Sequence, residues 1–153
     1  MRDCEVVVGR TFVVAMEDGD DFFASLRVFC GRNKIQQAYI PGFIAGFRKA
    51  KLVGTVEEVT DKNAPVWSHV YLENVEALGC GTIAVNEAGE FSPHIHVTVG
   101  RKIQGADAYT SHLLEAEVIF LAEIMIVEIT APKLVRIKNQ RLYDVALLSF
   151  MKG

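Results

Sequence analysis

The sequence predicts an α+β fold in which one main helix accompanies a mixed, mainly antiparallel β-sheet. Apolar residues recur at helical spacing in a single segment, at about residues 21–30. Most of the remaining chain consists of short runs rich in β-branched and aromatic residues. Because helical and β-rich segments do not alternate, a sheet built from parallel β-α-β units is not expected.

A strand is expected over residues 11–16, followed by an acidic turn and then the helix. Asp20 or Asp21 can accept hydrogen bonds from the first free N–H groups of that helix. Gly31 is expected to end it. The apolar residues at helical spacing are Phe22, Leu26 and Phe29.

The β-rich runs after the helix are separated by turn residues, and Pro41 indicates a bulge or a strand end within the first run. A loop is expected over 61–65 and a turn over 86–90. The ranges expected to form strands are 35–47, 51–59, 66–73, 75–85, 92–99, 116–129, 133–138 and 145–150. No repeat or linker divides the 153 residues, so we expect one domain over 1–153, with its core at about 10–150.

The composition is that of a globular protein, with 50% hydrophobic and 23% charged residues. The net charge of −3 has the wrong sign for a protein whose whole surface binds nucleic-acid phosphates, although it allows a local basic patch. The mean hydropathy of +0.22 is high for a monomer. It favours an oligomer that buries apolar surface between subunits.

Three cysteines, Cys4, Cys30 and Cys80, are odd in number and widely spaced, which indicates reduced thiols in a cytoplasmic protein. Cys80 lies in an apolar strand and is expected to be buried. No signal peptide is recognised at the start of the sequence, and no apolar run approaches the roughly 20 residues of a membrane helix.

A cluster of histidines is the feature that indicates chemistry. His94 and His96 lie in a strictly alternating run, so both side chains are expected on one face of a strand. His112 follows sixteen residues after His96, and residues 104–107 form a credible turn midway between them. A hairpin closing there places His112 directly beside His96, on the same face.

Three neutral imidazoles with this arrangement suit a zinc ion, whose fourth position is then open to water or to a carboxylate. Glu76 is the candidate for this carboxylate, because it is a charge within an otherwise apolar run. Imidazoles also bind nickel, iron and manganese, so the residues alone do not identify the ion. The alternative interpretation is a polar strand face without a metal.

The pattern Gly-x-Phe-x-Pro-His-x-His over 89–96, followed by Ser-His-Leu over 111–113 and by a β-branched strand with a glutamate over 118–123, resembles the PPC ("plants and prokaryotes conserved") domain. The resemblance extends in order and pattern over nearly the whole chain, including 75–83 and 136–148. It is closest to the bacterial and archaeal type, because the AT-hook Arg-Gly-Arg-Pro of the plant members is absent from this sequence.

The resemblance implies a homotrimer with a fold similar to that of acetolactate decarboxylase. It also implies a metal, zinc in the first place, on His94, His96 and His112, with Glu76 matching the family's glutamate near that site. The sequence departs from the family pattern at Thr110 and Ser111, where the family usually has two glycines.

Two functions follow as hypotheses, and the sequence leaves open whether the protein is an enzyme. The first is metal-dependent hydrolysis or carbonyl chemistry on a small metabolite, with Glu76 or Glu123 as the general base. The second is DNA binding, as the naming of the family suggests, with a structural metal and with phosphate contacts from two basic clusters. These clusters are Arg48, Lys49 and Lys51, and Lys133, Arg136, Lys138 and Arg141.

Overall fold

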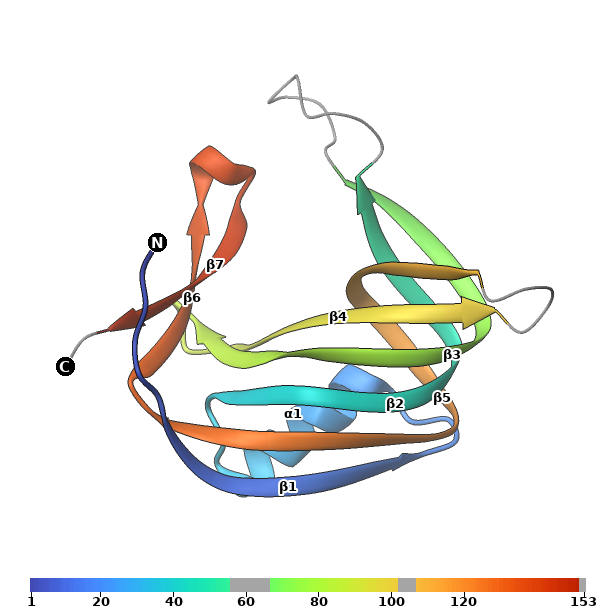
Figure 1. Ribbon diagram of the computed structural model, residues 1–153, viewed down its shortest axis with the longest axis horizontal. Helices are drawn as coiled ribbons and strands as arrows, with labels where there is room; N and C mark the ends of the chain where they lie inside the picture. Colours follow the sequence, from blue (N-terminus) through green and yellow to red (C-terminus); the bar gives the residue numbers. More distant parts are fainter. Residues whose placement is uncertain (56–66, 102–106, 152–153) are drawn as a thin grey trace.

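The computed structural model describes residues 1–55, 67–101 and 107–151. Within them, one α-helix accompanies a seven-stranded sheet whose strand pairs are antiparallel except for one, so the predicted fold class is confirmed (Figure 1). The elements are β1 (Val7–Glu17), α1 (Phe22–Asn33), β2 (Ala38–Thr55), β3 (Trp67–Asn86), β4 (Phe91–Arg101), β5 (Ala108–Ala131), β6 (Lys133–Asn139), a 3-10 turn (Gln140–Leu142) and β7 (Val145–Met151).

Strands β2, β3, β4 and β5 pair in a closed ring, in which β2 contacts β3, β3 contacts β4, β4 contacts β5 and β5 returns to β2. Strand β1 pairs with β5 on the other side. The hairpin of β6 and β7 joins the end of β3 through a short parallel pairing and projects from the ring (Figure 1). This pairing brings residues from the end of the chain beside the middle of it.

The helix α1 forms where the sequence predicts it, and its two ends have different causes. The Asp21 carboxylate accepts a hydrogen bond from the Ala24 N–H at 2.8 Å and caps the first turn. The prediction that Gly31 ends the helix is wrong, because the helix continues to Asn33 and Lys34 takes the left-handed conformation at φ 57°. The residues of α1 that enter the core are Phe22, Leu26, Phe29 and Cys30.

Two pairs of predicted strands are single long strands. The runs 35–47 and 51–59 are joined in β2, as far as the structure describes them, and the runs 66–73 and 75–85 are joined in β3. Neither intervening segment contains a chain reversal, and Phe47 and Leu52 keep the core face of β2 apolar. The bulge predicted at Pro41 is present as a register shift between Ile40 and Phe43.

The remaining strands and the turn over 86–90 agree with the prediction. The loop predicted over 61–65 lies outside the described residues. The core is formed by α1 and the inner faces of the ring strands. No helix among the described residues has the length and apolar character needed to cross a membrane.

Candidate metal centre

The structure brings His94, His96 and His112 together on one face of β4 and β5. His96 of β4 lies directly opposite His112 of β5, which is the register that the predicted hairpin requires. Ile95 and Val97 point to the other face, where they are 0% and 1% exposed. Apart from Asp107, the turn predicted over 104–107 lies outside the described residues.

The donor atoms of the three histidines all lie within 4.8 Å of one another. The Nε2 atoms of His94 and His96 are 3.0 Å apart. Two nitrogen ligands at 2.0–2.1 Å from one tetrahedral ion stand roughly 3.4 Å apart, so a small adjustment of the side chains accommodates an ion between them. Three imidazoles are also a donor set that zinc and other divalent transition metals accept.

Burial keeps two of these imidazoles neutral. It lowers the pKa of His94 to about 4, with further contributions from the charges of Arg136, His112 and His96. The pKa of His112 is also lowered, first by burial and then by His96 and Arg136. At neutral pH both rings therefore have a nitrogen lone pair available for a metal.

Strand β3 pairs with β4 and places its own side chains next to the histidines. Thr82 lies opposite His94, and Cys80 lies opposite His96. The expectation that Cys80 is buried is wrong: it is exposed, because alternation along β3 directs it to the histidine face. A Cβ added at Gly81 would collide with the His94 carbonyl oxygen and with Ile95, so glycine there lets β3 lie close to β4.

The two residues that replace the family's glycines are accommodated by hydrogen bonds. The hydroxyl oxygens of Thr110 and Thr98 lie 2.8 Å apart across β4 and β5. The Ser111 hydroxyl donates to the Val53 carbonyl oxygen. Both side chains thus tie β5 to neighbouring strands next to His112.

Glu76 lies on the same face of β3 as Cys80, but four residues farther along the strand. At about 3.3 Å per residue, this separation is on the order of 13 Å. Glu76 is exposed, and the group that can share an ion among the described residues consists of the three histidines. Its catalytic role stays a prediction. Glu123 is exposed on β5, opposite Ile44.

The two predicted basic clusters differ in how their charges are placed. In the first, Arg48 contacts Asp18 at 2.8 Å and Glu117 at 2.9 Å, and Lys51 contacts Glu115 at 2.7 Å. These contacts neutralise much of its positive charge.

In the second cluster, Arg136 is not part of a surface patch, because it is buried with 5% exposure. Sequence reasoning counted Arg136 as a surface charge and missed its place beside the histidines. The available signal was a charge in the apolar run 134–137, the same signal that singled out Glu76.

Comparison with solved structures shows the fold in other organisms. A plant- and prokaryote-conserved (PPC) protein of Pyrococcus horikoshii is 26% identical, with a TM-score of 0.81 and 100% of both chains covered. A protein of Archaeoglobus fulgidus that is described as metal-containing is 21% identical, with a TM-score of 0.80, and the match covers 99% of this chain and 100% of that one.

A protein of Ralstonia eutropha that is described as a candidate DNA-binding protein is 20% identical, with a TM-score of 0.72, and the match covers 90% of this chain and 89% of that one. Acetolactate decarboxylase of Bacillus subtilis is 11% identical with a TM-score of 0.56, over 84% of this chain and 56% of that one, which confirms the expected likeness of fold. None of the curated protein sequences matches the chain.

The family resemblance has an independent confirmation in the sequence. Residues 5–130 match the pattern of the Plants and Prokaryotes Conserved (PCC) domain. The match includes all three clustered histidines and all four ring strands except the last residue of β5. The chain therefore belongs to the Plants and Prokaryotes Conserved domain family.

Proposed function

We propose that the protein binds one divalent transition-metal ion, zinc in the first place, through His94, His96 and His112. The observation that supports this most strongly is the convergence of three imidazole donors within 4.8 Å from two different strands. The lowered pKa values of His94 and His112 support it further, because a protonated imidazole cannot bind a metal. A neighbour of the same fold is described as metal-containing.

Three protein ligands leave one position of a tetrahedral ion open, which is the arrangement of catalytic rather than structural zinc sites. An ion held in this way polarises carbonyl oxygens and lowers the pKa of water in its open position to about 7. The reaction class that follows is hydrolysis or carbonyl chemistry on a small metabolite. Glu76 is the proposed general base, and its distance from the cluster requires that it come from a neighbouring copy of the chain.

Self-association, as a homotrimer, is part of the proposal. The outer face of the sheet carries large apolar side chains that are exposed by 43–75%. Four of them, Val13, Ile44, Leu78 and Met125, line one hollow of about 350 Å³. An exposed apolar patch of this kind is typical of a subunit interface. We propose a second copy of the chain as the partner that covers this hollow, and that copy would contribute its own Glu76.

The first test is metal content by elemental analysis of protein purified without a tag. We expect about one zinc per chain in the wild type and its loss in the double variant His94→Ala/His96→Ala. His69→Ala is the matched control, because His69 is exposed on β3 and lies outside the cluster. If the wild-type protein takes up no divalent metal after reconstitution, the proposal is wrong and the three histidines form only a polar strand face.

DNA binding is the second candidate, and one surface feature favours it. Arg2, Lys138 and Arg141 line a hollow of about 580 Å³, and none of the described lining residues is acidic. Fluorescence anisotropy with duplex DNA tests this candidate at about 50 and 200 mM salt, because affinity from phosphate contacts falls steeply over that range. Absence of binding at the lower salt concentration rejects it.

A further inference from the structure

Arg136 is the only charged side chain that is buried among the described residues. It lies on β6, and its two terminal nitrogens donate hydrogen bonds to the Thr82 hydroxyl and to the Ala146 carbonyl oxygen. Its Nε–H has no hydrogen-bond partner in the described part of the chain. The guanidinium therefore keeps its Nε–H donor unused in a place from which water is largely excluded.

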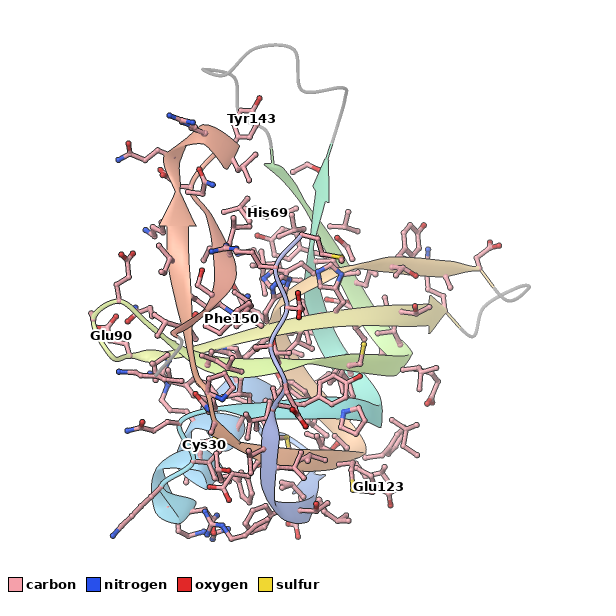
Figure 2. The ribbon with its side chains drawn as sticks, turned by 60° about the vertical axis from the view of Figure 1, so that its left-hand side comes forward. Cys30, His69, Glu90, Glu123, Tyr143 and Phe150 are labelled. Carbon is pink, nitrogen blue, oxygen red and sulfur yellow. The ribbon has the colours of Figure 1, made fainter. Side chains whose placement is uncertain are left out.

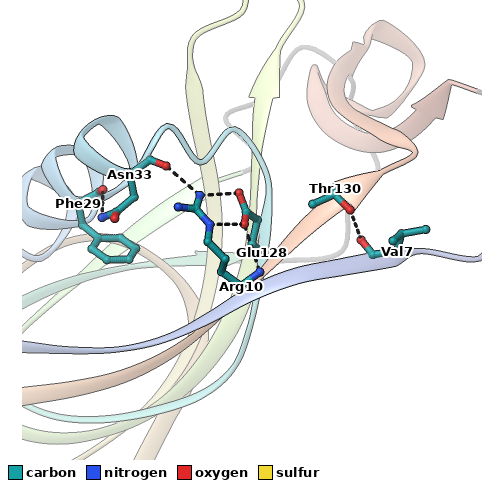
Figure 3. A network of polar contacts seen from close by, with 6 residues as sticks. All are labelled: Val7, Arg10, Phe29, Asn33, Glu128 and Thr130. Atoms are coloured by element: carbon teal, nitrogen blue, oxygen red, sulfur yellow. Dashed lines mark hydrogen bonds and ion pairs between the residues drawn. The ribbon is translucent and has the colours of Figure 1, made fainter.

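The guanidinium also has no counter-ion, since no carboxylate of the described residues lies within 4.0 Å of it. The guanidinium of Arg10, which is far more exposed, donates two hydrogen bonds to the Glu128 carboxylate, at 2.7 and 2.9 Å (Figure 3). A buried charge without a partner is costly for the folded state. An anion that binds from outside would supply the missing partner.

The position of Arg136 connects it with the candidate metal centre. Thr82, which accepts its hydrogen bond, lies directly opposite His94 on the neighbouring strand. Directly opposed residues have their Cβ atoms about 5 Å apart, so the guanidinium lies on the histidine face within the span of a small molecule. With an ion on three neutral imidazoles, this region would hold several positive charges, and among the described residues no carboxylate lies within 4.0 Å of the guanidinium.

A cavity of about 330 Å³ adjoins the guanidinium, and its lining is mainly apolar although it also includes Arg2 and Asp3. Leu148, which lies opposite Arg136 in the hairpin, and Leu134, two residues before it, both line the cavity. Thr82 and Phe150 line it too, and Figure 2 shows Phe150 on the side of β7 that faces the ring. The volume is at the lower end for ligand pockets, which suits a small molecule.

We propose that Arg136 binds the carboxylate of a small organic acid whose apolar part occupies the adjoining cavity. The planar guanidinium offers its Nε–H edge, which matches the geometry of a carboxylate. The assignment of this acid as the substrate class rests on the proposed function, because only the metal would make it a reactant. The contact between Arg136 and the carboxylate does not depend on the metal.

The test is isothermal titration calorimetry with pentanoate, with the neutral pentanamide and with inorganic phosphate, on protein loaded with zinc and on protein treated with a chelator. We expect pentanoate to bind wild-type protein at least 10-fold more tightly than pentanamide or phosphate. Arg136→Met should weaken pentanoate binding at least 10-fold. Arg32→Met is the matched control, because Arg32 is exposed on α1 and its replacement should leave pentanoate binding unchanged.

A second variant keeps the test decisive if Arg136→Met does not fold, as judged by circular dichroism. Thr82→Val retains the guanidinium but removes the hydroxyl that positions it, so it should weaken pentanoate binding by a smaller factor. Equal binding of pentanoate and pentanamide, or unchanged binding in both variants, overturns the inference. Phosphate binding as tight as that of pentanoate overturns the assignment to a carboxylate.

Metal content measured on the same samples separates this inference from the proposed function. Protein that takes up no zinc on loading but binds pentanoate through Arg136 supports the inference and contradicts the metal centre. If the protein holds one zinc per chain and Arg136→Met binds pentanoate as tightly as the wild type does, the result supports the metal centre and contradicts the inference.

Discussion

At the scale of single residues, His94 shows how burial prepares an imidazole for a metal. Its pKa is lowered to about 4, chiefly because the charged form loses hydration when the ring is half-buried. The nearby guanidinium of Arg136 acts in the same direction. Protons and a metal ion compete for the same ring nitrogen, and a low pKa weakens the competition from protons. The site is therefore already suited to an ion before one binds.

The lowered pKa of His94 predicts how the metal-free protein responds to acid. In the unfolded chain the imidazole takes up a proton near its ordinary pKa of 6.5, whereas folded His94 does so only near 4. Between these values the unfolded state binds more protons, so stability falls as the pH decreases from about 6.5 to 4. Thermal melting of chelator-treated protein across this range measures the fall, and His94→Gln should make it shallower.

Glu128 supplies an internal reference for this experiment. Its pKa is lowered to about 2, first by the hydrogen bond from the Arg10 side chain. The stability that this contact adds is present above the ordinary glutamate pKa of 4.5 and is lost as the pH falls toward 2. The loss below about pH 4.5 should therefore persist in His94→Gln. If His94→Gln abolished the loss of stability in both pH ranges, the assignment of the upper range to His94 would be wrong.

At the scale of elements, the close pairing of β3 and β4 sets the position of two metal-ligand candidates. Gly79 and Gly81 alternate with Cys80 on β3, and their missing side chains leave room for the backbone of β4. A Cβ at Gly79 would meet the Phe43 ring and the His96 carbonyl oxygen. Glycine at these positions therefore has a steric reason that acts directly on the strand carrying His94 and His96.

Gly81→Ala is expected to displace β4, because the new methyl group would collide with the His94 carbonyl oxygen. The displaced histidines should retain zinc at least 10-fold less tightly, and the melting temperature should fall. Gly31→Ala is the matched control, because a Cβ there meets open space on the helix. That control should stabilise the protein by about 0.5–1 kcal/mol, since alanine is the better helix former. Competition with a chromogenic zinc chelator measures retention.

The cap of α1 gives a second prediction at this scale. Asp21→Ala removes the acceptor of the Ala24 N–H and should cost about 1 kcal/mol of unfolding free energy. Asp21→Asn retains a side-chain acceptor and should cost much less. Urea unfolding measures both variants, and equal losses would show that the charge rather than the hydrogen bond matters.

At the scale of the whole molecule, the histidines and the exposed apolar residues share one outer face of the sheet. Leu78 is 63% exposed on β3, on the same face as Cys80, which lies opposite His96. Ile44, directly opposite Leu78 on β2, is 52% exposed. Association of copies through this face would place the candidate metal centre at the edge of a subunit interface.

Ile44→Glu is expected to dissociate the proposed trimer, because a carboxylate buried at an apolar interface has no partner there. Analytical ultracentrifugation should give a mass of about three times the 16.9 kDa of one chain for the wild type and a smaller mass for the variant. Val28→Glu is the control, because Val28 is 67% exposed on the helix, away from this face. A monomeric wild-type protein contradicts the trimer.

The sequence by itself determined the features that depend on neighbours along the chain. The alternation at 92–99 set the common face of His94 and His96, because side chains on a strand alternate with a period of two. The spacing to His112 set its register, because a hairpin fixes which residues face each other. The helix was equally local, since its apolar spacing and its cap lie within one segment.

Only the tertiary structure decided the features that depend on distant pairing. Arg136 looked like one charge of a surface cluster until the parallel pairing of β6 with the end of β3 brought it onto Thr82, 54 residues away. Arg48 and Lys51 likewise looked like unpaired surface charges, but they form ion pairs with carboxylates from other parts of the chain. Local pattern cannot reveal these outcomes, because burial and charge pairing depend on which strands meet, and that is decided by the packing of the whole chain.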